Sequence, residues 1–199
     1  MIENYEIRKK ARESLKGKWN IPVIAHLILF AVAISPGLFH PALQLILNLL
    51  FTGAFSFGMV ALFLLLVRKK KHAVKNIFDG FRILERTIPL SLWMCLFILL
   101  WALLLIIPGI IAAFRYSMSY YILYDNPKIK VKDAIRKSKE MMLGYKWKLF
   151  CLHFSFIGWY LLGILTLGIG WLWVATYQGA ATAIFYEELK KEKSTKKKA

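Results

Sequence analysis

Long apolar stretches and short basic segments alternate along the whole chain. A membrane hydrocarbon core of ~30 Å is crossed by ~20 helical residues. The stretches that approach this length are Trp19–Phe39, Pro41–Val67, Ile88–Ile107, Gly109–Tyr124, Trp147–Leu165 and Ile169–Tyr186. The turns that join them in pairs contain no Lys, Arg, Asp or Glu; they are Ser35–Ala42, Pro108–Gly109 and Leu165–Gly170. The pattern therefore predicts three helical hairpins.

Positive charge lies between these hairpins and at both ends of the chain. All but one of the 28 Lys and Arg residues fall into clusters at residues 8–18, 68–86, 128–148 and 190–198. Loops on the cytoplasmic side of a membrane collect Lys and Arg. The expected fold class is therefore all-α: a polytopic membrane helical bundle with six transmembrane helices. We expect it to be multi-pass in the cell (plasma) membrane, with N- and C-termini cytoplasmic.

A short basic segment with helical periodicity precedes each hairpin. The positions that share one face are Ile7, Ala11 and Leu15 in the first segment, Val74, Ile77, Phe78, Phe81 and Leu84 in the second, and Val131, Ile135, Ser138 and Met142 in the third. Each segment predicts a short amphipathic helix on the cytoplasmic face. Such a helix lies either in the headgroup plane or packed on the base of the bundle.

This weak repeat gives the expected domain organisation. We expect a single integral membrane domain, residues 1–189, made of units of about 1–67, 68–125 and 126–189. Residues 190–199 are Lys-rich and have no apolar face, so they are expected to form a basic flexible tail. The 58% share of hydrophobic residues agrees with a membrane protein, because it exceeds what one soluble core of this size would hide.

Composition narrows the classes of function. A net charge of +17 ordinarily indicates nucleic acid or an anionic surface as the partner. Because the charge gathers where the hairpins meet the inner leaflet, we expect anionic membrane lipids and not nucleic acid. The sequence has no phosphate-binding loop, nucleophile elbow or His–carboxylate pair, so no enzyme activity is expected. Its histidines lack metal-ligand spacing, and neither a metal nor a cofactor is expected.

Arg115 is the one Lys or Arg residue outside the four clusters, and it lies near the middle of a predicted span. A central arginine costs ~2.5–3.5 kcal/mol on membrane-insertion scales. No Asp or Glu lies within a predicted span to offset it, and Asp125 is the nearest acid in the sequence. Arg115 is therefore either part of a site for an anion or phospholipid headgroup, or a guanidinium bonded to helix carbonyls.

Polar residues follow one face of the second span. Gln44, Asn48, Thr52 and Ser56 recur at every fourth position. This spacing places them on one slowly drifting face of a helix. They either form interhelical hydrogen bonds, each worth ~0.6 kcal/mol on average, or line a conduit together with Arg115.

Several motifs resemble a known family. They include Pro108-Gly109-Ile110-Ile111, Arg115-Tyr116-Ser117-Met118, Asp125-Asn126-Pro127 and Ser155-Phe156-Ile157-Gly158-Trp159. With these motifs in this order, the chain resembles the "domain of unknown function 975" family of small integral membrane proteins, found mainly in Gram-positive bacteria. That family is distantly similar to the membrane domain of some glycerophosphodiester phosphodiesterases. The resemblance implies a bacterial plasma-membrane location and a helical bundle, and it supplies no catalytic residue.

Two functions are compatible with these features. The leading hypothesis is a non-enzymatic accessory or scaffold protein that engages anionic lipid or a membrane protein partner, including a second copy of itself. Its candidate ligand- or headgroup-binding residues are Arg115, Gln44, Asn48 and Asp125. The alternative is a small-molecule or lipid permease whose polar path is lined by Gln44, Asn48 and Arg115.

Overall fold

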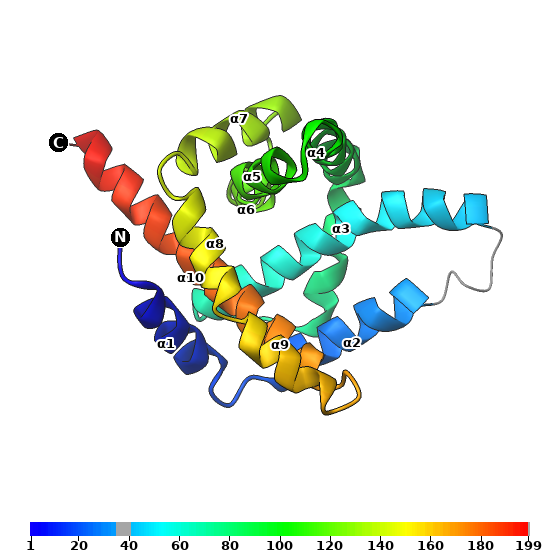
Figure 1. Ribbon diagram of the computed structural model, residues 1–199, viewed down its shortest axis with the longest axis vertical. Helices are drawn as coiled ribbons and strands as arrows, with labels where there is room; N and C mark the ends of the chain where they lie inside the picture. Colours follow the sequence, from blue (N-terminus) through cyan, green and yellow to red (C-terminus); the bar gives the residue numbers. More distant parts are fainter. Residues whose placement is uncertain (35–40, 199) are drawn as a thin grey trace.

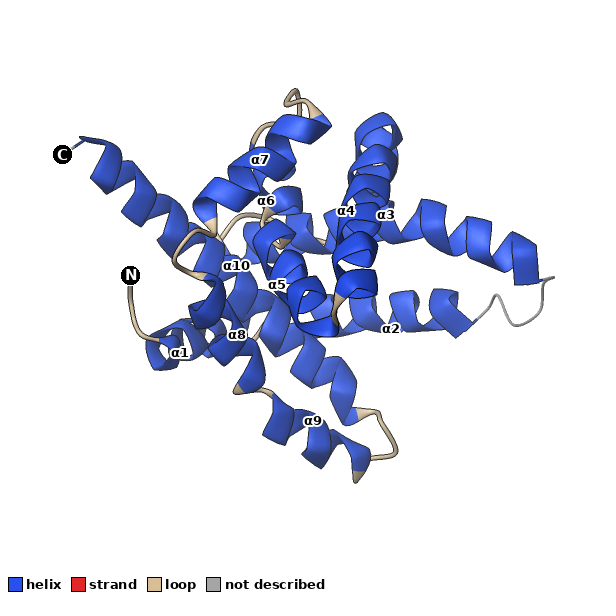
Figure 2. Ribbon diagram, turned by 45° about the horizontal axis from the view of Figure 1, so that its top comes forward, coloured by secondary structure: helices blue, strands red, loops and turns tan. Residues whose placement is uncertain are grey.

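The computed structural model describes residues 1–34 and 41–198, with side chains described for residues 1–32 and 51–195. Every regular element within these ranges is a helix, which confirms the all-α class (Figure 1, Figure 2). The elements are α1 (Asn4–Leu15), α2 (Asn20–Ile34), α3 (Pro41–Val67), the 3₁₀ helix η2 (Val74–Ile83), α4 (Leu84–Leu104), α5 (Ile106–Tyr116), α6 (Ser119–Asp125), α7 (Val131–Met141), α8 (Lys146–Phe154), α9 (Ile157–Ile164) and α10 (Gly170–Lys198).

The helices at the two ends of the chain pack together in one core. α10 contacts α1, α3, α8 and α9, so the first and last helices share one core (Figure 1). Its buried side chains include Ile7, Leu15, Leu62, Leu66, Met118, Leu149, Phe156 and Phe185. Burying a large apolar side chain contributes ~1.5–3 kcal/mol. This core therefore holds the first and last helices together, and the helical hairpins extend from it.

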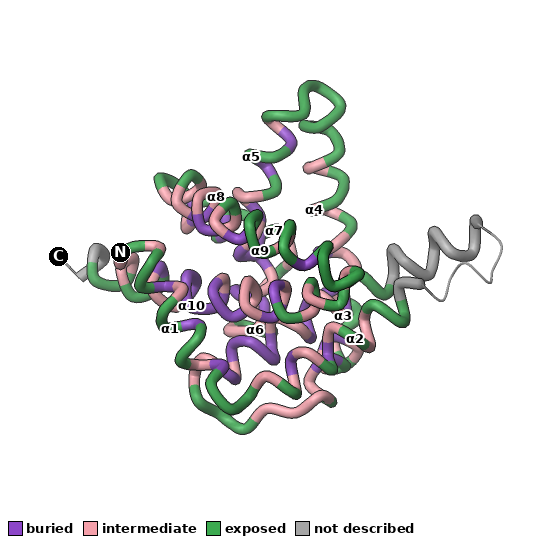
Figure 3. The backbone as a smooth tube through the Cα atoms, turned by 60° about the horizontal axis from the view of Figure 1, so that its bottom comes forward, coloured by how far each residue is buried: buried purple, intermediate pink, exposed green. Residues whose placement is uncertain are grey.

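Three antiparallel pairs of helices extend from this core. α2 contacts α3, α4 contacts α5, and α9 contacts α10. The described parts of the α2–α3 pair and the α4–α5 pair project in different directions (Figure 3). The ends of the α4–α5 and α9–α10 pairs expose large apolar side chains, including Leu103 at 83% and Leu167 at 95%. Exposed apolar surface of this kind is typical of a region that a membrane or a partner covers.

The described part of the chain contains three helices long and apolar enough to cross a membrane. They are Val74–Leu104, Ile106–Asp125 and Lys146–Ile164. A fourth is added if α1 and the described part of α2, which meet at a bend of 97°, form one broken span. α3 has the predicted limits, α9 ends within one residue of the predicted Leu165, and α10 begins within one residue of the predicted Ile169 but extends beyond the predicted Tyr186. Six spans do not follow from these helices, because the apolar part of α3 with described side chains, Phe51–Val67, is shorter than a span and α10 is not among the sufficiently apolar helices.

The second predicted turn lies elsewhere in the structure. The chain reverses at Leu105, which is extended (φ −162°, ψ 146°), and not at Pro108–Gly109. Pro108 lies in the first turn of α5, where a missing N–H is tolerated. A Cβ on Gly109 would come within 2.8 Å of the Ala102 Cα. The Pro-Gly pair therefore starts a helix and permits close packing against α4.

The other two predicted turns differ in what the structure describes. The chain between Ile164 and Gly170 forms the predicted turn, with Gly168 at a φ of +85°. A left-handed backbone of this kind favours glycine. The turn predicted at Ser35–Ala42 falls mostly outside the described residues.

The basic segments before the hairpins are helical, and each buries part of its predicted apolar face against the bundle, while Phe78 and Leu84 of the second are exposed at 48% and 37%. The buried positions are Ile7, Ala11 and Leu15 in α1, Ile77 and Gly80 in η2, and Ala134, Ile135 and Ser138 in α7. A Cβ on Gly58 of α3 would come within 1.8 Å of the Ile77 carbonyl oxygen. Of the two predicted placements, in the headgroup plane or packed on the bundle, the second accounts for these buried positions.

The C-terminal residues continue α10. The sequence predicted a tail from Lys190, but the helix extends to Lys198. The N-terminal amine of Met1 pairs with Glu192 at 2.8 Å, and the Lys193 Nζ lies 5.5 Å from the centroid of the Tyr145 ring. Lys and Glu are good helix formers. With these partners available, the segment is helical without an apolar face of its own.

Candidate functional site

A basic pocket lies between α4, α5 and α7. Its volume is about 590 Å³. It is lined by Trp93, Phe97 and Trp101 from α4, Arg115 and Tyr116 from α5, and Lys132, Ile135, Arg136 and Lys139 from α7. We call it the Arg115 pocket. Among the described residues, no Asp or Glu lines it. The pocket therefore gathers four cations against an aromatic wall, an arrangement suited to an anion.

The spacing of the basic residues on α7 puts them on one side of the helix. Lys132, Arg136 and Lys139 stand at positions i, i+4 and i+7, which share a face. The neighbouring Ile135 is buried against α4 and α5, so this face is turned toward the pocket. The Lys132 ammonium lies 5.5 Å from the centroid of the Trp93 ring. A cation at this distance is attracted to the face of an indole ring.

Arg136 is the pocket cation that has an acidic neighbour. Its guanidinium lies 2.9 Å from a carboxylate oxygen of Asp133, one turn earlier on α7. The Arg136 side chain is 68% exposed and the Asp133 side chain 37% exposed. An exposed pair of this kind contributes at most ~1 kcal/mol. Arg136 therefore remains free to turn toward an anion.

Ser138 fixes the position of Arg115. The Ser138 hydroxyl donates to the Arg115 carbonyl oxygen at 2.9 Å and accepts from the Met118 N–H at 3.2 Å. These two bonds hold the break between α5 and α6 against α7. The half-buried Arg115 guanidinium has no hydrogen bond or ion pair to any described residue. The alternative in which helix carbonyls satisfy it is therefore not found among the described residues.

Asp125 belongs to a different group of charges. Arg68, just beyond α3, donates to an Asp125 carboxylate oxygen at 2.7 Å and to Glu187 of α10 at 2.8 Å. The Tyr186 hydroxyl donates to the other Asp125 oxygen at 2.9 Å, and the Lys190 ammonium also binds it. Asp125 therefore joins the ends of α3, α6 and α10, and it does not line the Arg115 pocket.

The environment of Arg68 keeps its charge. Partial burial acts to lower the pKa of Arg68, but its hydrogen bonds to Asp125 and Glu187 outweigh burial, and the pKa is raised. Its side chain is 23% exposed. The cationic partner of Asp125 is thus charged at every physiological pH.

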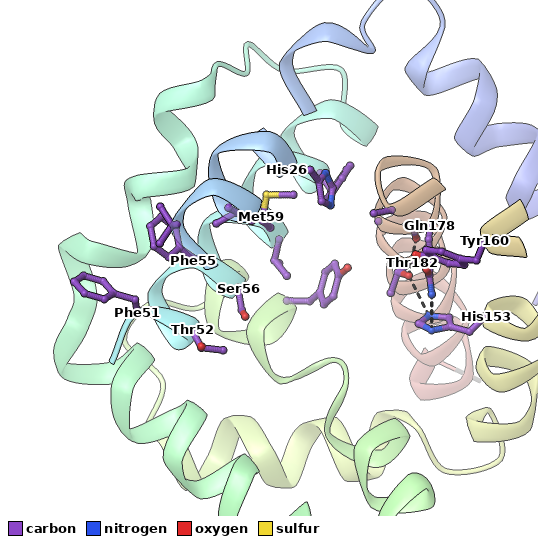
Figure 4. A pocket seen from close by; sticks show the side chains of 17 residues that line it. His26, Phe51, Thr52, Phe55, Ser56, Met59, His153, Tyr160, Gln178 and Thr182 are labelled. Carbon is purple, nitrogen blue, oxygen red and sulfur yellow. Dashed lines mark hydrogen bonds between the residues drawn. The ribbon is translucent and has the colours of Figure 1, made fainter. Parts of the chain in front are cut away.

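The predicted polar stripe of α3 is described only in its second half. Gln44 and Asn48 lie in α3, but their side chains fall outside the described residues. Thr52 and Ser56 line a separate cavity with His26 and His153, which does not include Arg115 (Figure 4). The described part of the stripe and Arg115 therefore do not share one cavity.

Arg115 was predicted from the sequence as a site residue, but the other pocket residues were not. The i, i+4, i+7 spacing of Lys132, Arg136 and Lys139 was available in the sequence as a basic helix face. Nothing in the sequence indicated that this face packs beside α5. Among the described residues, no group of three or more His, Cys, Asp or Glu is placed to hold a metal ion.

Comparison with known proteins gives a family. No curated protein and no solved structure matches the chain. One protein-family model matches the chain twice, over residues 1–112 and 91–193. Together these matches cover nearly the whole chain, including the helices of the Arg115 pocket. The chain therefore belongs to the family described as "Protein of unknown function (DUF975)".

Proposed function

We propose that this protein is a multi-pass membrane protein that binds the headgroup of an anionic lipid in the Arg115 pocket. The observation that carries the proposal is the gathering of Arg115, Lys132, Arg136 and Lys139 in a pocket without a described acidic residue. The role expected from the sequence, a non-enzymatic accessory or scaffold protein of the plasma membrane, is compatible with such binding. A membrane protein partner or a second copy of the chain remains part of that expectation.

The chemistry of the pocket favours a phosphate group. A guanidinium donates paired hydrogen bonds to a phosphate, and a lysine adds a compact positive charge. Arg115 lacks a described partner, so a phosphate would supply its guanidinium with hydrogen-bond acceptors that no described residue provides. Each basic residue near an anionic leaflet gains ~1 kcal/mol. Four cations together give a preference for anionic over zwitterionic lipids.

The surroundings of the pocket supply a place for acyl chains. Beyond Trp101, the α4–α5 hairpin exposes consecutive apolar residues, with Leu104 at 68% and Ile106 at 76%. Trp93 and Trp101 line the pocket itself, and tryptophan favours the boundary between headgroups and hydrocarbon. A lipid with its phosphate beside Arg115 would therefore lay its chains along this hairpin.

The membrane topology stays a prediction. Six spans in three hairpins with both termini cytoplasmic would place all three basic segments at the inner leaflet. The observed pairing of α2 with α3, α4 with α5 and α9 with α10 supports the hairpins. The divergence of the hairpins bears on how many of them cross completely (Figure 3). The distant similarity to the membrane domain of glycerophosphodiester phosphodiesterases also stays a prediction.

The proposal is tested by titrating the detergent-solubilised protein with dioleoyl phosphatidylglycerol or dioleoyl phosphatidylcholine and counting bound lipids by native mass spectrometry. We expect Arg115→Gln to weaken phosphatidylglycerol binding about tenfold or more, since a hydrogen bond to a charged group contributes ~1.5–3 kcal/mol. Arg82→Gln on η2 removes a guanidinium outside the pocket and is the matched control. Equal binding of both lipids by the wild type would contradict the proposal.

The permease alternative has less support. It requires a polar path lined by Gln44, Asn48 and Arg115. Thr52 and Ser56, which continue the same stripe, line a cavity that Arg115 does not reach. The anion-binding pocket is therefore the better guide to function.

A further inference from the structure

A second cavity lies among α2, α3, α6, α8, α9 and α10. Its volume is about 500 Å³, within the ~300–1,000 Å³ of typical ligand pockets. Figure 4 shows Thr52 and Ser56 on α3, with His153, Gln178 and Thr182 on the opposite side. We call it the His26 cavity. It shares no lining residue with the Arg115 pocket, so its role is independent of the function proposed above.

The lining of the His26 cavity combines apolar side chains with uncharged polar ones. Among the described residues, no Lys, Arg, Asp or Glu lines it. Its apolar walls include Phe55, Met59 and Phe63. An ion placed there would lack a counter-charge, which is costly in an apolar environment. The cavity therefore favours an uncharged occupant with both polar and apolar parts.

Both ring nitrogens of His153 are hydrogen-bonded to neighbouring side chains. The Tyr160 hydroxyl donates to the Gln178 side-chain oxygen at 2.6 Å. The Gln178 amide nitrogen then donates to His153 Nδ1 at 3.0 Å, which makes Nδ1 an acceptor. The Thr182 hydroxyl donates to the Gln178 carbonyl at 2.8 Å, so His153 Nε2 donates to Thr182 across 3.3 Å. This closed chain fixes one neutral tautomer and offers a ligand no free nitrogen.

His26 differs from His153 because one ring nitrogen is unused. Its Nδ1 lies 3.0 Å from the Pro22 carbonyl oxygen, which only accepts, so Nδ1 carries the proton. Thr176 also lies 3.1 Å from Nδ1. In the neutral ring, Nε2 is then an acceptor, and it has no hydrogen bond to a described residue. The ring extends from α2 toward the cavity (Figure 4).

Hydroxyl groups complete the polar part of the lining. Ser56 and Tyr121 line the cavity, and neither hydroxyl makes a hydrogen bond to a described residue. A hydroxyl both donates and accepts. A ligand in the cavity can therefore donate a hydroxyl to His26 Nε2 and accept, through its own oxygen atoms, from one of these two side chains.

We propose that the His26 cavity binds an uncharged molecule that carries a hydroxyl group on an apolar body. The hydroxyl hydrogen-bonds to His26 Nε2, and the body packs against Phe55, Met59 and Phe63. Such a molecule comes either from the membrane, as a neutral lipid alcohol of the diacylglycerol type, or from water, as a small aliphatic alcohol. Both sources share the chemistry that the cavity recognises.

The test measures binding of 1,2-dioctanoylglycerol to the solubilised full-length protein by native mass spectrometry. We expect His26→Phe and Ser56→Ala each to weaken binding about threefold to tenfold, the loss of one hydrogen bond. His72→Phe and Ser117→Ala remove the same groups outside the cavity and should leave binding unchanged. If His26→Phe fails to fold, Ser56→Ala and the ligand comparison below still decide the matter.

A matched ligand provides the second arm. The 3-acetyl ester of dioctanoylglycerol has the same apolar body but no hydroxyl, and we expect it to bind as weakly to wild type as the alcohol binds to His26→Phe. Equal binding of alcohol and ester, or variants that match their controls, would overturn the proposal. Hexane-1,6-diol bound in a His26-dependent way, without dioctanoylglycerol, would support the cavity's chemistry and assign the water-soluble source.

Discussion

Ser138 shows how one hydroxyl positions a functional side chain. It links the carbonyl of Arg115 to the N–H of Met118 and so holds α5, α6 and α7 together. Both Ser138 and Met118 are fully buried. A buried backbone group that loses its partner is costly, and the geometry of the pocket depends on this junction.

We therefore expect Ser138→Ala to lower the free energy of unfolding by ~1–3 kcal/mol. Thermal unfolding in detergent, followed by circular dichroism, measures the change. Ser117→Ala is the matched control, because the Ser117 hydroxyl bonds only to the Phe114 carbonyl one turn earlier. A loss in Ser117→Ala equal to that in Ser138→Ala would show that the junction is not stabilised in this way.

Asp125 is a second single residue on which the packing of helices depends. Its carboxylate is 9% exposed and has Arg68, Tyr186 and Lys190 as partners. We expect Asp125→Asn to cost ~1.5–3 kcal/mol of unfolding free energy, the range for hydrogen bonds to charged groups. Asp133→Asn, which breaks an exposed pair on α7, should cost no more than ~1 kcal/mol. Chemical unfolding of both variants compares the two carboxylates, and equal costs would remove the special role of Asp125.

At the scale of elements, glycine decides how closely helices approach. Gly80 of η2 lies against α3, and a Cβ there would come within 2.0 Å of the Ala54 carbonyl oxygen. Gly158 of α9 faces open space, with nothing within 4 Å of such a Cβ. We expect Gly80→Ala to destabilise the protein by ~1–3 kcal/mol, and Gly158→Ala to be neutral or slightly stabilising. Melting temperatures of the two variants check this, and similar values would contradict the close packing.

The length of α5 limits how deeply the α4–α5 hairpin can enter a membrane. α5 has 11 residues, and at ~1.5 Å per residue it spans ~16 Å, about half of a ~30 Å hydrocarbon core. Arg115 stands near its inner end, level with the exposed cations of α7. If these charges lie among headgroups, the tip at Ile106 lies inside the hydrocarbon and does not emerge on the far side.

Cysteine labelling measures this depth in membrane vesicles. In a background with Cys95 and Cys151 replaced by serine, we expect Ile106→Cys to resist a membrane-impermeant maleimide from both sides. Lys137→Cys on α7 should react from the cytoplasmic side. Reaction of Ile106→Cys from the outer side would instead support a complete crossing, as six spans require.

At the scale of the whole molecule, local patterns predicted the helices but not how they assemble. The apolar stretch of α3 and the periodicity of Ile7, Ala11 and Leu15 were sufficient, because each depends on neighbours in sequence. The Arg115 pocket instead brings α5 together with Lys132–Lys139 of α7. The Ser138 hydrogen bond to the Arg115 carbonyl joins residues that are not neighbours in the sequence. Pro108 was misplaced because proline both ends helices and begins them.

Arg115 is the residue proposed to bind the headgroup of an anionic lipid. The most direct measurement extracts wild type and Arg115→Leu with their native lipids in polymer nanodiscs and identifies the retained lipids by native mass spectrometry. We expect a defined anionic lipid on the wild type and its loss from a folded Arg115→Leu variant. The same unselective lipids on both proteins would contradict it and make Arg115 a structural residue.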